Sequence, residues 1–114
     1  GIMQEEVFGP LLPVCTVMSF NEAIKLANDT KFGLTAVVFT KSKEKIAQAQ
    51  KELQVGTVYI NDTGIFYPQV PYQGVKESGV GVEGGKHGLW EFTIKKHLHT
   101  NLNSSKTRDY WFPY

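Results

Sequence analysis

The first 60 residues alternate between short apolar runs and segments with helical periodicity. The apolar runs are rich in side chains that favour strands, and they predict three strands, at residues 11–18, 35–40 and 57–60. Pro13 interrupts the first of these runs. Because strands separated by helices at this spacing are typical of βαβ units, we expect an α/β fold. Its sheet should be largely parallel, with flanking helices and strands that are buried on both faces.

Each of the two helical segments begins with a recognisable signal. Ser19 and Glu22 have the spacing of a capping box, and apolar residues follow on one stripe until Asn28. Ser42 can cap the second segment, whose apolar residues recur at helical spacing until Gly56. We therefore expect two helices that cover the sheet.

The pattern changes after Asn61. Residues 62–85 show no periodicity and contain many glycines, and loops of this length in compact domains are usually functional. A short helix is expected at residues 86–92, followed by a last strand at residues 93–102. In that strand apolar and polar residues alternate, which is the pattern of a half-exposed edge strand that can pair with another chain.

Length and composition fit one ordinary domain. The chain has 114 residues and a net charge of +1, which gives no electrostatic signature of a nucleic-acid partner. No apolar run approaches the roughly 20 residues of a membrane-spanning helix, and the N-terminal residues lack the pattern of a signal peptide. The single cysteine, Cys15, has no internal disulfide partner. We therefore expect a cytoplasmic protein without a membrane partner. The aromatic residues concentrated at 110–114 are expected to dock on the molecule or on a partner.

Two motifs give the chain a family resemblance. The first is EVFGP at residues 6–10, and the second is PYQGVKESGVGVEGG at residues 71–85. They are similar to E-x-F-G-P and P-F-G-G-x-K-x-S-G-x-G-R-E-x-G, which aldehyde dehydrogenases carry in the same order. The chain thus resembles the C-terminal part of the aldehyde dehydrogenase catalytic domain. It departs from the second motif at Gln73, where the family usually has glycine, and at Val82, where it usually has arginine.

The resemblance implies an enzyme that uses NAD or NADP to oxidise a small-molecule aldehyde to a carboxylic acid. Residues 1–92 would belong to the catalytic domain, and residues 93–114 would form an oligomerisation strand and an aromatic tail that join a homo-oligomer. The family's nucleophilic cysteine and cofactor domain precede the first motif, so this segment alone is expected to be inactive. The alternative is a truncated, standalone protein that acts as an oligomerisation or interaction module without catalysis.

By the same resemblance, four residues contact ligands, and none is assigned to catalysis. Glu6 would accept hydrogen bonds from the ribose hydroxyls of the nicotinamide nucleotide, and Phe8 would pack near the nicotinamide ring. Two positions apart in an extended segment, their side chains emerge on one face. Phe66 and Tyr72 would line the substrate tunnel. The alternative for Glu6 is a solvated surface charge, and the alternative for the three aromatic residues is packing in the core.

Other conspicuous residues receive structural interpretations. Residues 79–84 satisfy G-x-G-x-x-G, but a polar loop precedes them, so we expect these glycines to provide positive φ angles and close backbone contacts rather than a dinucleotide site. Asn61 and Lys76 are expected to hold the backbone of the loop. Cys15 lies in an apolar run and is expected to be buried rather than reactive. The H-x-H sequence at residues 97–99 lacks further ligands, so no metal site is expected.

Overall fold

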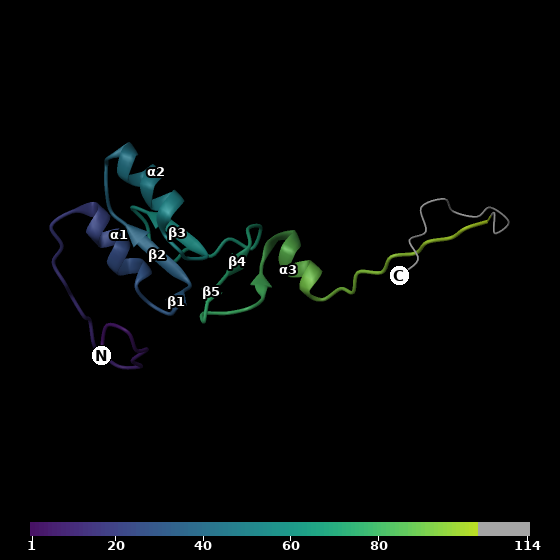
Figure 1. Ribbon diagram of the computed structural model, residues 1–114, viewed down its shortest axis with the longest axis horizontal. Coiled ribbons are helices and arrows are strands. Elements are labelled where there is room, and N and C mark those ends of the chain that lie inside the picture. Colours follow the sequence, from purple (N-terminus) through teal and green to yellow (C-terminus); the bar gives the residue numbers. More distant parts are fainter. Residues whose placement is uncertain (103–114) are drawn as a thin grey trace, which may run out of the picture.

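The structure is a computed structural model that describes residues 1–102; the predicted aromatic tail at residues 110–114 lies outside the described residues. Helices and short strands follow one another along the described chain (Figure 1). The elements are α1 (Phe20–Asn28), β1 (Phe32–Gly33), β2 (Thr35–Val38), α2 (Lys43–Glu52), β3 (Thr57–Ile60), β4 (Tyr72–Gln73), β5 (Val75–Lys76), β6 (Val82–Glu83) and α3 (Gly85–Glu91).

A βαβ unit forms the structural centre of the chain. β2 and β3 pair in parallel, with α2 as the connection between them, and their register places Thr35 opposite Thr57 and Val38 opposite Ile60. α1 packs beside α2, and the two buried hydrophobic residues of the described chain are Ile24 and Ala49, one on each of these helices. The predicted parallel pairing is confirmed, and so is the predicted strand at residues 57–60. The second strand ends at Val38, earlier than predicted.

The predicted capping signals of both helices are confirmed. Ser19 Oγ accepts a hydrogen bond from the backbone N–H of Glu22 at 3.1 Å, and Glu22 Oε2 accepts one from the N–H of Met18 at 2.7 Å. At the second helix, Ser42 Oγ accepts a hydrogen bond from the N–H of Lys45 at 3.3 Å. The two serine side chains satisfy donors that the first turn of a helix leaves without a partner, while Glu22 binds the N–H of the residue before the cap.

The segment predicted as a loop at residues 62–85 contains three two-residue strands. β5 pairs with β1 and β4 pairs with β6, both antiparallel, and the second pair places Gln73 opposite Val82. The prediction of a largely parallel sheet is therefore wrong in part: the described residues form three separate pairs of strands, of which one is parallel. Strands this short have no alternation of apolar and polar residues, so periodicity could not reveal them.

Two predicted strands are wrong. Neither residues 11–18 nor residues 93–102 form a strand. A strand needs a neighbour whose backbone groups complete its hydrogen-bond ladder, and within the described chain neither segment pairs with one. For the same reason the prediction that Cys15 is buried is also wrong, because its side chain is exposed.

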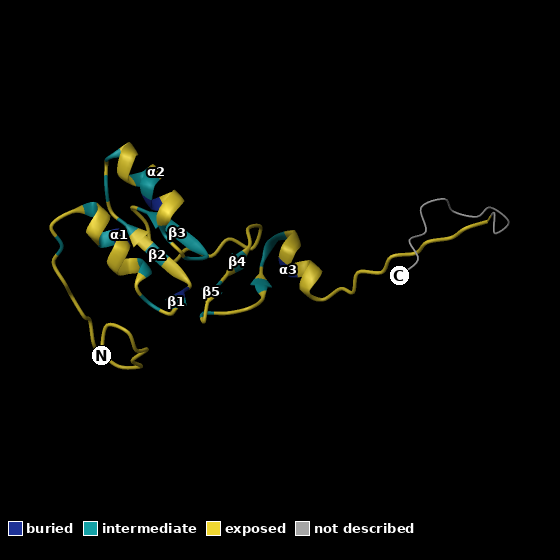
Figure 2. Cartoon of the chain, viewed as in Figure 1, coloured by how far each residue is buried: buried dark blue, intermediate teal, exposed yellow. Residues whose placement is uncertain are grey.

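Apolar side chains are widely exposed in the described chain (Figure 2). The expectation of strands buried on both faces is wrong here: residues along β2 alternate between exposed and half-buried, and all four residues of β3 are half-buried. Among the apolar side chains that are at least four-fifths exposed are Phe8, Leu12, Val14, Met18, Phe92, Ile94 and Leu98. Apolar surface of this extent is typical of a region that contacts further protein.

Candidate functional site

Asn61 joins the ends of the two parallel strands. Its Oδ1 accepts a hydrogen bond from the N–H of Thr40 at 2.8 Å, and its Nδ2 donates one to the carbonyl of Thr40 at 2.9 Å. Its backbone has φ +55°, a left-handed conformation that asparagine tolerates better than most residues. The prediction that Asn61 holds the backbone of the loop after β3 is therefore wrong: its side chain binds the backbone that follows β2.

We expect Asn61→Ala to destabilise the protein by about 2–3 kcal/mol, because it removes two hydrogen bonds and leaves alanine in a left-handed conformation. Asn61→Gly should cost less, since glycine adopts this φ without strain. The measurement is the midpoint of urea unfolding, with Asn21→Ala as control. Asn21 is an asparagine on α1 whose side chain accepts one exposed hydrogen bond, from Gln48. Equal midpoints for the two alanine variants would contradict this role of Asn61.

The glycine-rich segment at residues 74–79 is fixed to the region around the end of α1. Lys76 Nζ donates hydrogen bonds to the carbonyls of Asn28 at 2.8 Å and of Thr30 at 3.0 Å. Ser78 Oγ accepts a hydrogen bond from the N–H of Gly33 at 2.8 Å. A cation beside the carbonyls at a helix C-terminus is also favoured by the helix dipole. The prediction that Lys76 ties this loop to the domain is confirmed.

Glycines permit close backbone contacts around this segment. Within residues 79–84 the prediction of positive φ angles and close contacts is confirmed for Gly84 and is wrong for Gly79 and Gly81. A Cβ atom on Gly56 would overlap the carbonyl oxygen of Gln73, and one on Gly84 would lie 2.5 Å from the carbonyl oxygen of Val70. Gly84 also has φ +75°. Within residues 79–84, strand β6 lies between the second and third glycines. In a dinucleotide fingerprint the strand precedes the first glycine, so the geometry differs from that of such a site.

Phe66 and Tyr72, the two residues predicted to contact substrate, lie edge to face. Their ring centroids are 6.0 Å apart and their planes are inclined by 88°. Tyr59 and Tyr67 line the same hollow, and the hydroxyl of Tyr59 donates a hydrogen bond to the carbonyl of Ile65 at 3.1 Å, which holds this segment on β3. The hollow has a volume of about 70 Å³, far below the volume of a typical small-molecule site. The described chain therefore provides one aromatic wall rather than a complete pocket.

Glu6 and Phe8, the two residues predicted to contact the cofactor, lie in the irregular N-terminal segment. The exposed carboxylate of Glu6 borders a hollow of about 390 Å³ that Ser78 and residues around β1 and β2 also line. Phe8 is 95% exposed. This hollow and the one beside Phe66 and Tyr72 have no lining residue in common. The described chain thus brings Phe66 and Tyr72 together, but it does not place them in one hollow with Glu6.

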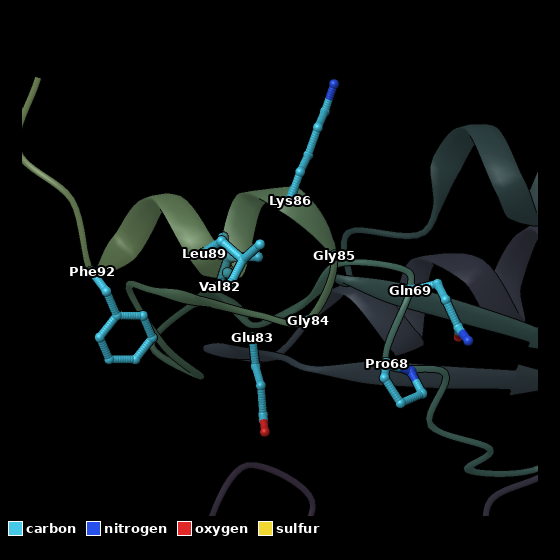
Figure 3. Close-up of a pocket in the computed structure, with 10 residues that line it drawn as sticks. Pro68, Gln69, Val82, Glu83, Gly84, Gly85, Lys86, Leu89 and Phe92 are labelled. Atoms are coloured by element: carbon cyan, nitrogen blue, oxygen red, sulfur yellow. The ribbon is translucent and has the colours of Figure 1, made fainter.

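An open hollow that was not predicted from the sequence lies beside α3 (Figure 3). Its volume is about 740 Å³. Figure 3 shows Val82 and Leu89 directed toward the same space, with Phe92 at one end and Lys86 pointing away. Val82 is one of the two departures from the family motif, and an apolar residue here leaves the hollow with an apolar lining. That departure was the only sequence signal that could have indicated this site.

The described residues show neither a metal cluster nor a membrane span. Within residues 1–102, no three or more His, Cys, Asp or Glu side chains gather as metal ligands would. The rings of His97 and His99 stack with centroids 6.4 Å apart. None of the helices in this part of the chain is long and apolar enough to cross a bilayer.

Fold, motifs and sequence comparison agree on the class of protein. A βαβ unit leads into an aromatic loop and a glycine-rich segment fixed by a lysine, and residues 1–98 match the aldehyde dehydrogenase family. The chain belongs to this family.

Particular relatives can be named. The chain is 46% identical over 111 residues to betaine aldehyde dehydrogenase from Bacillus subtilis (strain 168). This match covers 97% of the present chain and 22% of the relative. The solved structure of betaine aldehyde dehydrogenase from Staphylococcus aureus in complex with NAD+ matches with a TM-score of 0.84 and 43% identity, over 97% of this chain and 22% of that one. Lactaldehyde dehydrogenase from Escherichia coli matches with a TM-score of 0.77 and 42% identity, over 80% of this chain and 19% of that one. The chain therefore spans about a fifth of the length of these relatives.

Proposed function

We propose that this chain acts as the C-terminal portion of an NAD-dependent aldehyde dehydrogenase that oxidises an aldehyde to a carboxylic acid. The observation that carries the proposal is the match of 97% of the chain, with both motifs inside it, to a solved relative in complex with NAD+. Because the chain spans about a fifth of that relative, the nucleophile and most of the cofactor site are proposed to lie in further polypeptide. The chain alone would then be inactive.

In this proposal Glu6 and Phe8 position the nicotinamide end of the cofactor. When bound, the nicotinamide accepts a hydride from the substrate. The carboxylate of Glu6 is exposed at the edge of a hollow, so it can accept hydrogen bonds from the two hydroxyls of a ribose. The exposed ring of Phe8 would lie against the nicotinamide and exclude water from it. NAD is favoured over NADP because the relative was solved with NAD+.

Phe66 and Tyr72 provide the substrate wall. Their edge-to-face contact, together with the hydroxyls of Tyr59 and Tyr67, gives a surface of aromatic rings with polar groups at its edge. Such a surface favours a small polar or cationic aldehyde over a long alkyl one, since ring faces attract cations and hydroxyls donate hydrogen bonds. The similarity to betaine aldehyde dehydrogenases supports this preference.

The domain boundary and the oligomer are further parts of the proposal. Residues 1–92 would belong to the catalytic domain, while residues 93–114 would add a strand to a neighbouring subunit of a homo-oligomer in the cytoplasm. Support comes from residues 93–102, where Ile94 and Leu98 are 94% and 84% exposed and the backbone forms no strand by itself. A segment that pairs with no strand of its own described chain can form a hydrogen-bond ladder by adding to another sheet.

The proposal is tested by an assay of the full polypeptide that carries this chain. Betaine aldehyde, lactaldehyde and a long alkyl aldehyde are each offered with NAD or NADP, and formation of the reduced cofactor is followed by absorbance. We expect reduction of NAD that depends on aldehyde, highest with the two polar substrates, and none with the isolated 114-residue chain. If the full polypeptide reduces neither cofactor with any aldehyde, the proposal fails and the alternative of an interaction module gains support.

A further inference from the structure

We propose that Lys76 is a positioning residue for the substrate wall. Its ammonium group would fix residues 73–78 against the end of α1, and this would fix Tyr72 against Phe66. The inference rests on the proposed function, because it assigns a consequence for aldehyde binding to a contact that lies outside the substrate hollow.

The anchor point of Lys76 is itself held in place. Asn28, whose carbonyl accepts one of the two hydrogen bonds from Lys76 Nζ, ends α1. The side chain of Asn28 donates a hydrogen bond to the carbonyl of Glu52 at 2.7 Å and accepts one from the N–H of Gln54 at 2.8 Å. Asn28 thus ties the end of α1 to the end of α2, and Lys76 adds the glycine-rich segment to the same junction.

The backbone between Lys76 and Tyr72 has little freedom to move. Strand β5 pairs with β1 so that Val75 lies opposite Gly33, and a Cβ atom on Gly33 would lie 2.7 Å from Val75 Cγ2. The carbonyl of Gln73 lies against Gly56, where a Cβ atom would overlap it. A shift of Lys76 would therefore be passed through these close contacts to Gln73 and to Tyr72, which precedes it in the chain.

The conformation of Lys76 points to its side chain as the reason for a lysine at this position. Its backbone has φ +56°, a region that glycine adopts more easily than any residue with a Cβ atom. The ammonium group donates to two carbonyl oxygens, which have no proton to exchange. This arrangement suits a group that orients protein backbone and does not suit an acid or base that acts on substrate.

Three variants of the full polypeptide test the inference by steady-state kinetics. Lys76→Met keeps most of the aliphatic chain and removes the donors, Lys76→Arg keeps donors, and Lys31→Met is the matched control. Lys31 forms an exposed ion pair with Glu77 at 3.5 Å on the same segment. We expect Lys76→Met to raise KM for the aldehyde about tenfold while KM for NAD changes less than about twofold. Lys76→Arg should raise KM for the aldehyde less than Lys76→Met does. Lys31→Met should have the KM values of the unmodified enzyme.

Either of two results with Lys76→Met would overturn the inference. One is that Lys76→Met raises KM for the aldehyde and for NAD by the same factor and Lys76→Arg raises them as much, which would indicate general destabilisation. The other is an aldehyde KM that stays at the value of the Lys31→Met control. If Lys76→Met does not fold, Lys76→Gln replaces it, and an unchanged aldehyde KM in that variant also overturns the inference. Absence of aldehyde oxidation in the unmodified polypeptide would instead overturn the proposed function.

Discussion

Gly56→Ala is expected to destabilise the protein by more than about 3 kcal/mol. The new Cβ atom would overlap the carbonyl oxygen of Gln73 and lie 3.3 Å from that of Leu34, and both obstacles are backbone atoms. The N–H of Gly56 also donates a hydrogen bond to the carbonyl of Gly33 at 3.2 Å, so the backbone cannot move away without breaking that bond. The start of β3 and the end of β4 would have to separate. The free energy of unfolding, measured with urea, gives the size of the effect.

Gly79→Ala is the matched control for this substitution. The nearest heavy atom to a Cβ on Gly79 is 3.8 Å away, an ordinary contact distance. We expect the control to change the free energy of unfolding by less than about 0.5–1 kcal/mol, the range for a permissive glycine position. Similar losses in the two variants would mean that β3 and β4 do not lie as close together as described.

In the full polypeptide, Glu6→Gln is expected to lower kcat/KM for NAD about tenfold or more, which corresponds to a loss of at least about 1.4 kcal/mol of transition-state stabilisation. The reason is that hydrogen bonds to a carboxylate are roughly twice as strong as those to a neutral amide, and a glutamine side chain offers one acceptor oxygen in place of two. Steady-state kinetics at saturating aldehyde and varied NAD give kcat/KM for NAD in the variant and in the unmodified enzyme. Because Glu6 borders a hollow separate from that of Phe66 and Tyr72, KM for the aldehyde should change little.

Glu5→Gln separates this role from a general effect of charge. Glu5 precedes Glu6, its side chain is 74% exposed, and the substitution removes the same charge. We expect NAD kinetics close to those of the unmodified enzyme. If kcat/KM for NAD falls by the same factor in both variants, Glu6 acts only through the local electrostatic potential and not as a ligand of the ribose.

The parts of the fold that depend on local interactions could be predicted from the sequence. Ser19 and Ser42 cap helices by bonding to backbone groups within three residues, so their spacing is visible in the chain. The strand at residues 57–60 was predicted with its observed bounds, because a short apolar run between a helix and a polar segment has few alternatives. The structural role of Lys76 was predicted as well, although its two acceptors could not be named.

Features that depend on a partner distant in sequence could not be predicted. Residues 11–18 have the composition of a strand, but the described chain offers them no strand to pair with, and Cys15 is exposed as a result. The two-residue strands are also defined only by their partners. Gln73 and Val82 were identified separately as departures from the family motif, and the structure shows that they lie opposite each other across β4 and β6. Sequence order does not reveal such a pairing.

The intact mass of the natural polypeptide is the most direct test of whether this chain functions within a larger aldehyde dehydrogenase. The polypeptide is captured from its source cells with an antibody raised against residues 103–114, and its mass is measured without digestion. We predict a mass about four to five times that of this chain, since the chain covers 22% of its betaine aldehyde dehydrogenase relatives. A mass near 12.8 kDa would contradict the account and identify a standalone protein without the catalytic role proposed here.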